Sequence, residues 1–408
     1  MLDSHPLAPT ARRTALVFAL VLALLSFLDA RGQGEEDGRD SPGQPLVAPG
    51  QPLVEGQRHR VASKVFGGER ELHVRLPVGY TSSACEYPVV FVMDGDLHSQ
   101  VVAGIARSLA WADKMPSVIV VGVSSQTRGR ELTPPSEAGR GEGDRTLRFL
   151  LDEAVPFIEE HYRAARFRVL FGHSLGGLFA TYAMLTESDG FQAVIASSPS
   201  LYWEEGLLVR RFAEEFADME ARAFYFASAG DRGERGDIRA AVEELRRHME
   251  ASEPPELGWE ARTLVGADHF SSVPHAVLGA FETLFTGWGA YPLARRGDYD
   301  RLVSHYEQLQ GRFGYPVAIP EAMLNSTVYA LLRAGHHEGA LTGAERNVRA
   351  YPGSPNAHDT HGDMLEKAGR IEAAVAAYER ACRLAKQSRD PREAVFQEHL
   401  EQAREKLE

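Results

Sequence analysis

Residues 169–182, VLFGHSLGGLFATY, hold the pattern from which the rest of the sequence can be read. An apolar run ends in Gly-His-Ser-Leu-Gly-Gly, and a second apolar run of helical character follows. Gly172 and Gly176 frame Ser174 in the pattern G-x-S-x-G, which places a serine on a tight turn from strand to helix. Because larger side chains two positions away would clash there, the glycines favour a strained, exposed serine nucleophile over a plain turn residue.

The surrounding chain alternates strand-like and helix-like segments. Continuous apolar runs at 87–95 and 117–125 are typical of buried parallel strands, and 59–77 is typical of a β-hairpin. Apolar residues at helical spacing predict one helix over 145–162. Further strands are predicted at 166–172, 193–199, 223–230 and 259–266, and further helices at 175–185, 207–217, 237–249 and 274–285. This order predicts an α/β-hydrolase fold, a mostly parallel sheet with helices on both faces.

The first 57 residues do not resemble the rest. Arg12 and Arg13 precede an apolar run of about 15 residues and then small and polar residues, which is the pattern of a secretory signal peptide. We expect residues 1–30 to be this signal, with no stable membrane span after cleavage; a retained N-terminal anchor is the alternative. Residues 31–57 are rich in Gly, Pro, Gln and acids and predict a flexible leader. The protein is therefore expected to be exported, to the periplasm or outside the cell.

The C-terminal segment, residues 288–408, shows helical patterns without strands. Gly335 recurs as Gly369 and Ala340 as Ala374, each 34 residues apart (369 − 335 and 374 − 340), which is the period of tetratricopeptide repeats. Two repeats are convincing, whereas three or more are needed for independent stability. We therefore expect this TPR-like segment to pack on residues 58–287 or on another chain, and to offer a surface for a protein partner.

A serine nucleophile needs a histidine base, which follows it in this architecture. Most of the 15 histidines lie in the leader, in the helical segment or before Ser174. His173 lies inside the turn, and we interpret it as a packing residue. His269 follows the last predicted strand, on the loop before the last helix, whereas His275 lies one turn too far along. We predict that His269 is the base.

The acid that orients the base should follow the preceding strand. GDRGERGD, residues 230–237, offers Asp231, Glu234 and Asp237, of which Asp237 is better placed to cap the next helix. Asp268 neighbours His269 in sequence and would point elsewhere. We choose Glu234, keep Asp231 as an alternative, and keep a dyad without a charged partner as a third.

Two backbone amides are candidates for an oxyanion hole. The N–H of Leu175 lies at the start of the helix after the serine, where the helix dipole favours negative charge. The second donor should come from the loop after an earlier strand, predicted at 91–99, where the N–H of Gly95 or Asp96 is available. An ordinary polar loop is an equally good interpretation of Asp94 and Asp96.

Several motifs together resemble one family. VRLPVGY, YPVVFVMDGD, VIVVGVSSQTRGRELTP, LFGHSLGG, SSPSLYW and HFSSVPHAVLGAFETLF occur in the order found in the esterase D and enterochelin esterase family of α/β-hydrolases. The resemblance covers residues 60–285, and so it describes the predicted domain 58–287. It implies ester hydrolysis by Ser174 and His269, with Leu175 N–H in the oxyanion hole. In the glutathione-thioester relatives the second donor matches Asp96, while GDRGERGD does not align cleanly with the acidic position.

The sequence says less about the substrate and the partners than about the fold. Arg128 or Arg130 could bind an anionic group, although a structural salt bridge is the commoner role for either. Tyr202 and Trp203 could form an apolar wall or belong to the core. A formal net charge of −13 without a basic run excludes a nucleic-acid surface, and no metal cluster, phosphate loop or nucleotide fingerprint predicts a cofactor. The leading hypothesis is a hydrolase of a small or siderophore-like ester; a catalytically silent scaffold and an acyltransferase using the same serine are the alternatives.

Overall fold

The computed structural model of the protein describes residues 56–136, 139–215, 224–252 and 258–408. The predicted signal peptide, residues 1–30, lies outside the described residues, as does the predicted leader up to residue 55. Strand β1 (Gln57–Ser63) begins at the residue where the leader was predicted to end. Within the described ranges, no helix combines the length and the apolar character needed to cross a membrane.

An eight-stranded sheet forms the centre, with the strand order β1-β2-β4-β3-β5-β6-β7-β8. β1 and β2 (Gly68–Arg75) make the predicted hairpin, and β2 also pairs antiparallel with β4 (Ile119–Val123). All neighbours from β4 onward are parallel: β3 (Tyr87–Met93), β5 (Ala164–His173), β6 (Ala193–Ser197), β7 (Phe224–Gly230) and β8 (Gly258–Leu264). The predicted mostly parallel sheet is therefore confirmed.

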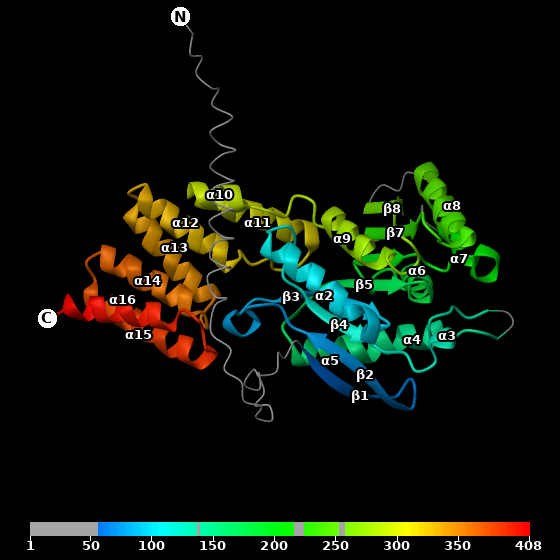
Figure 1. The fold of residues 1–408 in the computed structure, drawn as a ribbon, viewed down its shortest axis with the longest axis horizontal. Helices are drawn as coiled ribbons and strands as arrows, with labels where there is room; N and C mark the ends of the chain where they lie inside the picture. The colour runs from blue at the N-terminus through cyan, green and yellow to red at the C-terminus, as the bar shows by residue number, and fades with distance from the viewer. Residues whose placement is uncertain (1–55, 137–138, 216–223, 253–257) are drawn as a thin grey trace, which may run out of the picture. The chain divides into compact units, whose positions relative to one another are not determined.

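Helices cover both faces of this sheet (Figure 1). Successive side chains of a strand point to opposite faces, and in β3 the residues Val89, Phe91 and Met93 belong to one core while Val90 and Val92 belong to another. The first core includes residues of α6 (Leu175–Thr186), α7 (Trp203–Glu215) and α8 (Gly236–Ser252). The second includes residues of α2 (Gly95–Trp111) and α9 (Ser272–Leu284). Burial on both faces explains why the parallel strands are continuous apolar runs.

Two elements differ from the sequence prediction. The single helix expected over 145–162 is α4 (Gly143–Phe149), a π-helical turn (Leu150–Ala154) and α5 (Val155–His161). Pro156 has no backbone N–H to donate to the preceding turn, which accounts for an interruption there. The loop expected at 91–99 is short, because β3 ends at Met93 and α2 begins at Gly95.

The C-terminal segment is helical, as predicted. It contains α10 (Tyr291–Arg296), α11 (Tyr299–Phe313), α12 (Glu321–Arg333), α13 (His337–Ala350), α14 (Pro355–Lys367), α15 (Ile371–Ser388) and α16 (Glu393–Glu405). Gly335 lies between α12 and α13 with φ 80°, and Gly369 lies between α14 and α15 with φ 72°. Both glycines therefore adopt the left-handed conformation that ends a helix, at the predicted spacing. Assignment of these helices to the tetratricopeptide repeats, and their binding of a protein partner, stay predictions.

This helical segment shares its core with the sheet, as expected of a segment with too few repeats to stand alone. The ring of Phe313 in α11 packs 5.3 Å from Phe167 in β5 and 5.4 Å from Phe285 after α9. Further along, the N–H of Gly353 donates to the carbonyl of Ser82 at 3.1 Å. The apolar core is thus continuous across residues 287 and 288, where the sequence predicts a domain boundary.

Candidate active site

Ser174 lies between β5 and α6, with φ 57° and ψ −115°. A Cβ on Gly172 would lie 1.9 Å from the carbonyl oxygen of Gly176, and one on Gly177 would lie 3.0 Å from Cα of Pro199. The turn can therefore close only where these positions are glycine. Because a positive φ is costly for serine, the surrounding structure holds Ser174 in a conformation typical of a nucleophile elbow.

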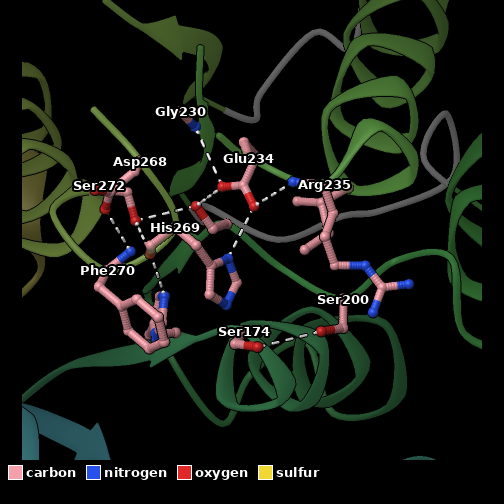
Figure 2. Close-up of polar contacts among 12 residues, drawn as sticks. Ser174, Ser200, Gly230, Glu234, Arg235, Asp268, His269, Phe270 and Ser272 are labelled. Carbon is pink, nitrogen blue, oxygen red and sulfur yellow. Dashed lines mark hydrogen bonds and ion pairs between the residues drawn. The ribbon is translucent and has the colours of Figure 1, made fainter. Parts of the chain in front are cut away.

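His269 and Glu234 are in direct contact. His269 follows β8 on the loop before α9, and Glu234 lies after β7, the neighbouring parallel strand. Nδ1 of His269 lies 2.9 Å from Oε1 of Glu234, whose side chain is fully buried (Figure 2). Since both residues follow the carboxyl ends of adjacent strands, the sheet itself brings them together.

The other predicted carboxylates bind elsewhere. Asp231 accepts from the N–H of Gly266 at 2.7 Å. Asp237 pairs with Arg235 and accepts from the backbone at the start of α8. Asp268 accepts from the N–H groups of its own loop. Of the four carboxylates that the sequence offered, Glu234 is therefore the one in contact with His269.

The second oxygen of Glu234 is held by Ser198, a residue that the sequence did not single out. Ser198 Oγ donates to Glu234 Oε2 at 2.6 Å, and the N–H of Gly230 approaches the same oxygen at 3.4 Å. Ser198 has φ 42°, so its backbone is strained as well. The signal in the sequence was the SSPS run that begins at Ser197, the last residue of β6, and has no generic reason to occur.

Ser174 makes its side-chain hydrogen bond with Ser200. The two hydroxyl oxygens lie 3.4 Å apart, and the N–H of Ser200 donates to the carbonyl of Ser174 at 3.0 Å. Within the described residues, Ser174 Oγ makes no hydrogen bond with His269, although Figure 2 shows the His269 ring directed toward Ser174. Such bonds are often long in unliganded hydrolases and tighten when substrate binds.

Two helix N-termini meet beside Ser174. Leu175 is the first residue of α6. Gly95 and Asp96 are the first two residues of α2, the helix that follows β3, and β3 is the parallel neighbour of β5. A Cβ on Gly176 would lie 3.3 Å from Met93 Cβ, so the two turns are in close contact. The first N–H groups of a helix have no helical carbonyl partner, and the dipole makes them attractive to an anion.

The arginines considered for substrate binding have partners within the protein. Arg128 makes a bidentate pair with Asp94, at 2.8 and 2.9 Å, and its Nη2 also approaches the carbonyl of His173 at 3.4 Å. Arg130 pairs with Glu142. Arg128 therefore braces the turn before α2 against the end of β5.

Tyr202 and Trp203 lie at the edge of the first core, partly buried. The guanidinium of Arg235 lies 4.5 Å from the centre of the Tyr202 ring, and that of Arg140 lies 5.6 Å from the Trp203 ring. Each aromatic side chain thus packs against the core and also lies near an arginine. In the view of Figure 2, the side chain of Arg235 is drawn above Ser200.

The neighbouring histidines differ from the sequence interpretation in one respect. His275 is exposed, and its Nδ1 bonds to the carbonyl of Ser271, the residue before its own helix. His173 is buried, as expected for packing, but its Nε2 also lies 2.7 Å from the backbone oxygen of His269. Burial lowers the pKa of His173 to about 3, so this ring is neutral near pH 7.

One group of side chains in the described residues has the spacing of a metal site, and it lies in the helical segment. Asp359, Asp363 and His399 can place one ligand atom each within 4.8 Å of one another. Their oxygens already accept hydrogen bonds: Asp359 from His399 at 2.9 Å, and Asp363 from Tyr329 at 2.5 Å and Tyr378 at 2.8 Å. The cluster is therefore satisfied as a hydrogen-bond network between α12, α14, α15 and α16.

Comparison with known proteins identifies relatives of the part of the chain that holds Ser174. Residues 63–261 match the model of the family described as "Putative esterase". This part of the chain belongs to that esterase family. The match includes Ser174, Ser198 and Glu234 and ends before His269.

Relatives of the esterase domain include the "Ferri-bacillibactin esterase BesA" of Bacillus subtilis, 28% identical over 149 residues, which are 31% of this chain and 52% of that protein. The "Siderophore triacetylfusarinine C esterase" of Aspergillus fumigatus is 27% identical over 146 residues, 32% of this chain and 50% of that protein. The chain thus spans about half the length of these curated relatives.

Solved structures share the fold of the esterase domain. An IroE-like serine hydrolase from Shewanella oneidensis superimposes with a TM-score of 0.63 and 22% identity, over 72% of this chain and 99% of that one. An uncharacterised protein from Capnocytophaga ochracea superimposes with a TM-score of 0.56 and 18% identity, over 86% of this chain and 99% of that one. The second match is longer than residues 58–287, so it includes part of the helical segment.

Proposed function

We propose that the protein is a serine carboxylester hydrolase. Ser174 is the nucleophile, His269 the general base and Glu234 the residue that orients it. One observation supports these assignments most strongly. Nδ1 of His269, on the loop between β8 and α9, contacts the buried carboxylate of Glu234. A buried carboxylate on Nδ1 fixes the tautomer in which Nε2 is free to accept a proton.

The reaction then proceeds by acyl transfer. Ser174 Oγ attacks the ester carbonyl while its proton passes to Nε2 of His269. The oxyanion is stabilised by the N–H groups of Leu175 and Asp96, and the imidazolium returns the proton to the leaving alcohol. Water, deprotonated by the same imidazole, attacks the acyl-enzyme, releases the acid and restores Ser174.

For the substrate we propose a siderophore-like ester or another small ester. The support is the names of the relatives, esterases of ferri-bacillibactin and of triacetylfusarinine C, each matched over about half its length. We also propose that the protein is exported, on the strength of the basic and apolar pattern within residues 1–30.

The test is hydrolysis of p-nitrophenyl esters, from acetate to octanoate, by the chain and by its Ser174→Ala variant. Loss of the nucleophile should reduce the rate on the order of 10⁴- to 10⁶-fold. Bacillibactin and triacetylfusarinine C, each with and without iron and followed by mass spectrometry, then test the substrate class. Equal rates for the two folded proteins on every ester would exclude Ser174 as the nucleophile, and cleavage of simple esters alone would reject the siderophore class.

A further inference from the structure

His173, the residue before the elbow serine, connects the nucleophile to the loop of the base. The residue is 3% exposed, and its Nε2 lies 2.7 Å from the backbone oxygen of His269. The end of β5 therefore carries Ser174 and, one residue earlier, a hydrogen bond to the residue that must reach it. Taking the proposed esterase function as given, we propose that His173 is a positioning residue that fixes the place of His269 relative to Ser174.

The oxygen that His173 holds is held from a second side. Ser272, at the start of α9, donates its hydroxyl to the same His269 carbonyl at 2.8 Å. The N–H of the same peptide, which belongs to Phe270, donates to Oδ1 of Asp268 at 3.0 Å. Three segments thus contact the peptide between His269 and Phe270. The donor from β5 is the one that fixes the position of this peptide relative to the strand that precedes Ser174.

The protonation state of His173 suits this role. His269 lies 4.6 Å away ring to ring, His98 lies 5.3 Å away, and the guanidinium of Arg128 approaches the His173 carbonyl at 3.4 Å. Burial lowers the pKa of His173 and also that of His98, so neither carries a charge near pH 7. A neutral His173 has one ring hydrogen, which lies on Nε2 because a carbonyl only accepts. It also places no positive charge beside the imidazolium that forms on His269 during the reaction.

A packing role and a positioning role make different demands on the side chain. Packing needs only volume, whereas positioning needs a donor at the place of Nε2. Glutamine and methionine have similar length and volume, and only glutamine can donate. The pair His173→Gln and His173→Met therefore separates the two roles.

The first measurement is the steady-state kinetics of both variants on the best p-nitrophenyl ester, with Ser174→Ala alongside. We expect His173→Met to lower kcat on the order of 10- to 100-fold with little change in KM, since a small misplacement of a reacting group costs about that much. His173→Gln should recover most of the loss. Equal kcat for the two variants would overturn the positioning role while Ser174 dependence still upheld the esterase.

The second measurement needs no substrate, so it stands even if the proposed esterase function fails. Amide hydrogen exchange over residues 268–272 should be faster in His173→Met than in the wild-type chain, and His173→Gln should lie near the wild type. Exchange rates that are the same in all three proteins would show that the carbonyl of His269 does not depend on His173, and would reject the inference independently of activity.

Discussion

Oε1 of Glu234 lies 2.9 Å from Nδ1 of His269, and the carboxylate is fully buried while the imidazole is 22% exposed. The carboxylate of Glu234 is thus enclosed by the protein, whereas the imidazole of His269 remains partly accessible. In the proposed mechanism the two residues have separate roles: Glu234 fixes the ring, and His269 moves the proton.

Glu234→Gln should therefore slow ester hydrolysis on the order of 10²- to 10⁴-fold, because an amide beside Nδ1 no longer enforces the productive tautomer. The measurement is kcat on the p-nitrophenyl ester, with Asp231→Asn as the matched control. Asp231 binds the N–H of Gly266, and an asparagine oxygen can accept the same bond, so this variant should stay within a few-fold of the wild type. A slower Asp231→Asn than Glu234→Gln would restore Asp231 as the acid, and an active Glu234→Gln would favour a dyad.

Gly172→Ala should destabilise the fold severely, since its Cβ would lie 1.9 Å from the backbone oxygen of Gly176. Relief of that overlap requires the elbow to open, at a cost of about 3 kcal/mol or more. Gly104→Ala is the control: Gly104 is exposed within α2, nothing lies within 4 Å of its added Cβ, and alanine should stabilise the helix by about 0.5–1 kcal/mol. Urea unfolding measures both, and similar midpoints for the two variants would contradict the tight elbow.

Much of the fold is readable from the sequence because it depends on local patterns. Continuous apolar runs marked the parallel strands, and G-x-S-x-G marked the turn after β5. The rule that parallel strands end at one edge then placed the His269 loop near Ser174. The start of α2 at Gly95 was not predicted, because the polar residues next to it are also typical of a loop, although apolar residues recur at helical spacing beyond them.

The remaining details of the site depend on contacts between distant segments. Asp231 and Glu234 follow the same strand only three residues apart, and which of them meets His269 depends on how the loop after β7 folds against the loop after β8. The bond from His173 to the His269 carbonyl spans 96 residues and involves a backbone oxygen, which leaves no signature in either side chain. The sequence also gives no sign of the positive φ of Ser198, because that position is occupied by serine and not glycine.

Ser198 should affect both activity and stability, and the two effects can be separated. Ser198→Ala removes the hydroxyl bond to Glu234 and keeps the strained φ of 42°, whereas Ser198→Gly removes the bond and relieves the strain. Both variants should lose activity, about tenfold for each 1.4 kcal/mol by which the orientation of Glu234 is weakened. Ser198→Gly should be the more stable of the two by about 1–2 kcal/mol. Full activity in either variant would show that Glu234 does not need this donor.

The buried, neutral His173 should make the protein sensitive to acid. Its pKa is lowered by burial from 6.5 to about 3, so below pH 6.5 the unfolded chain takes up a proton that the folded chain refuses. Its contribution to stability is therefore complete above pH 6.5 and is lost as the pH falls toward 3, by about 1.4 kcal/mol per pH unit. His173→Gln lacks this titration, so the free energy of unfolding of the wild type minus that of the variant should shrink as the pH falls from 6.5 to 4.5. Urea titrations at several pH values measure this difference. If the curve of His173→Gln ran parallel to that of the wild type, the pKa of His173 would be the same in the folded and the unfolded protein, and burial would not lower it.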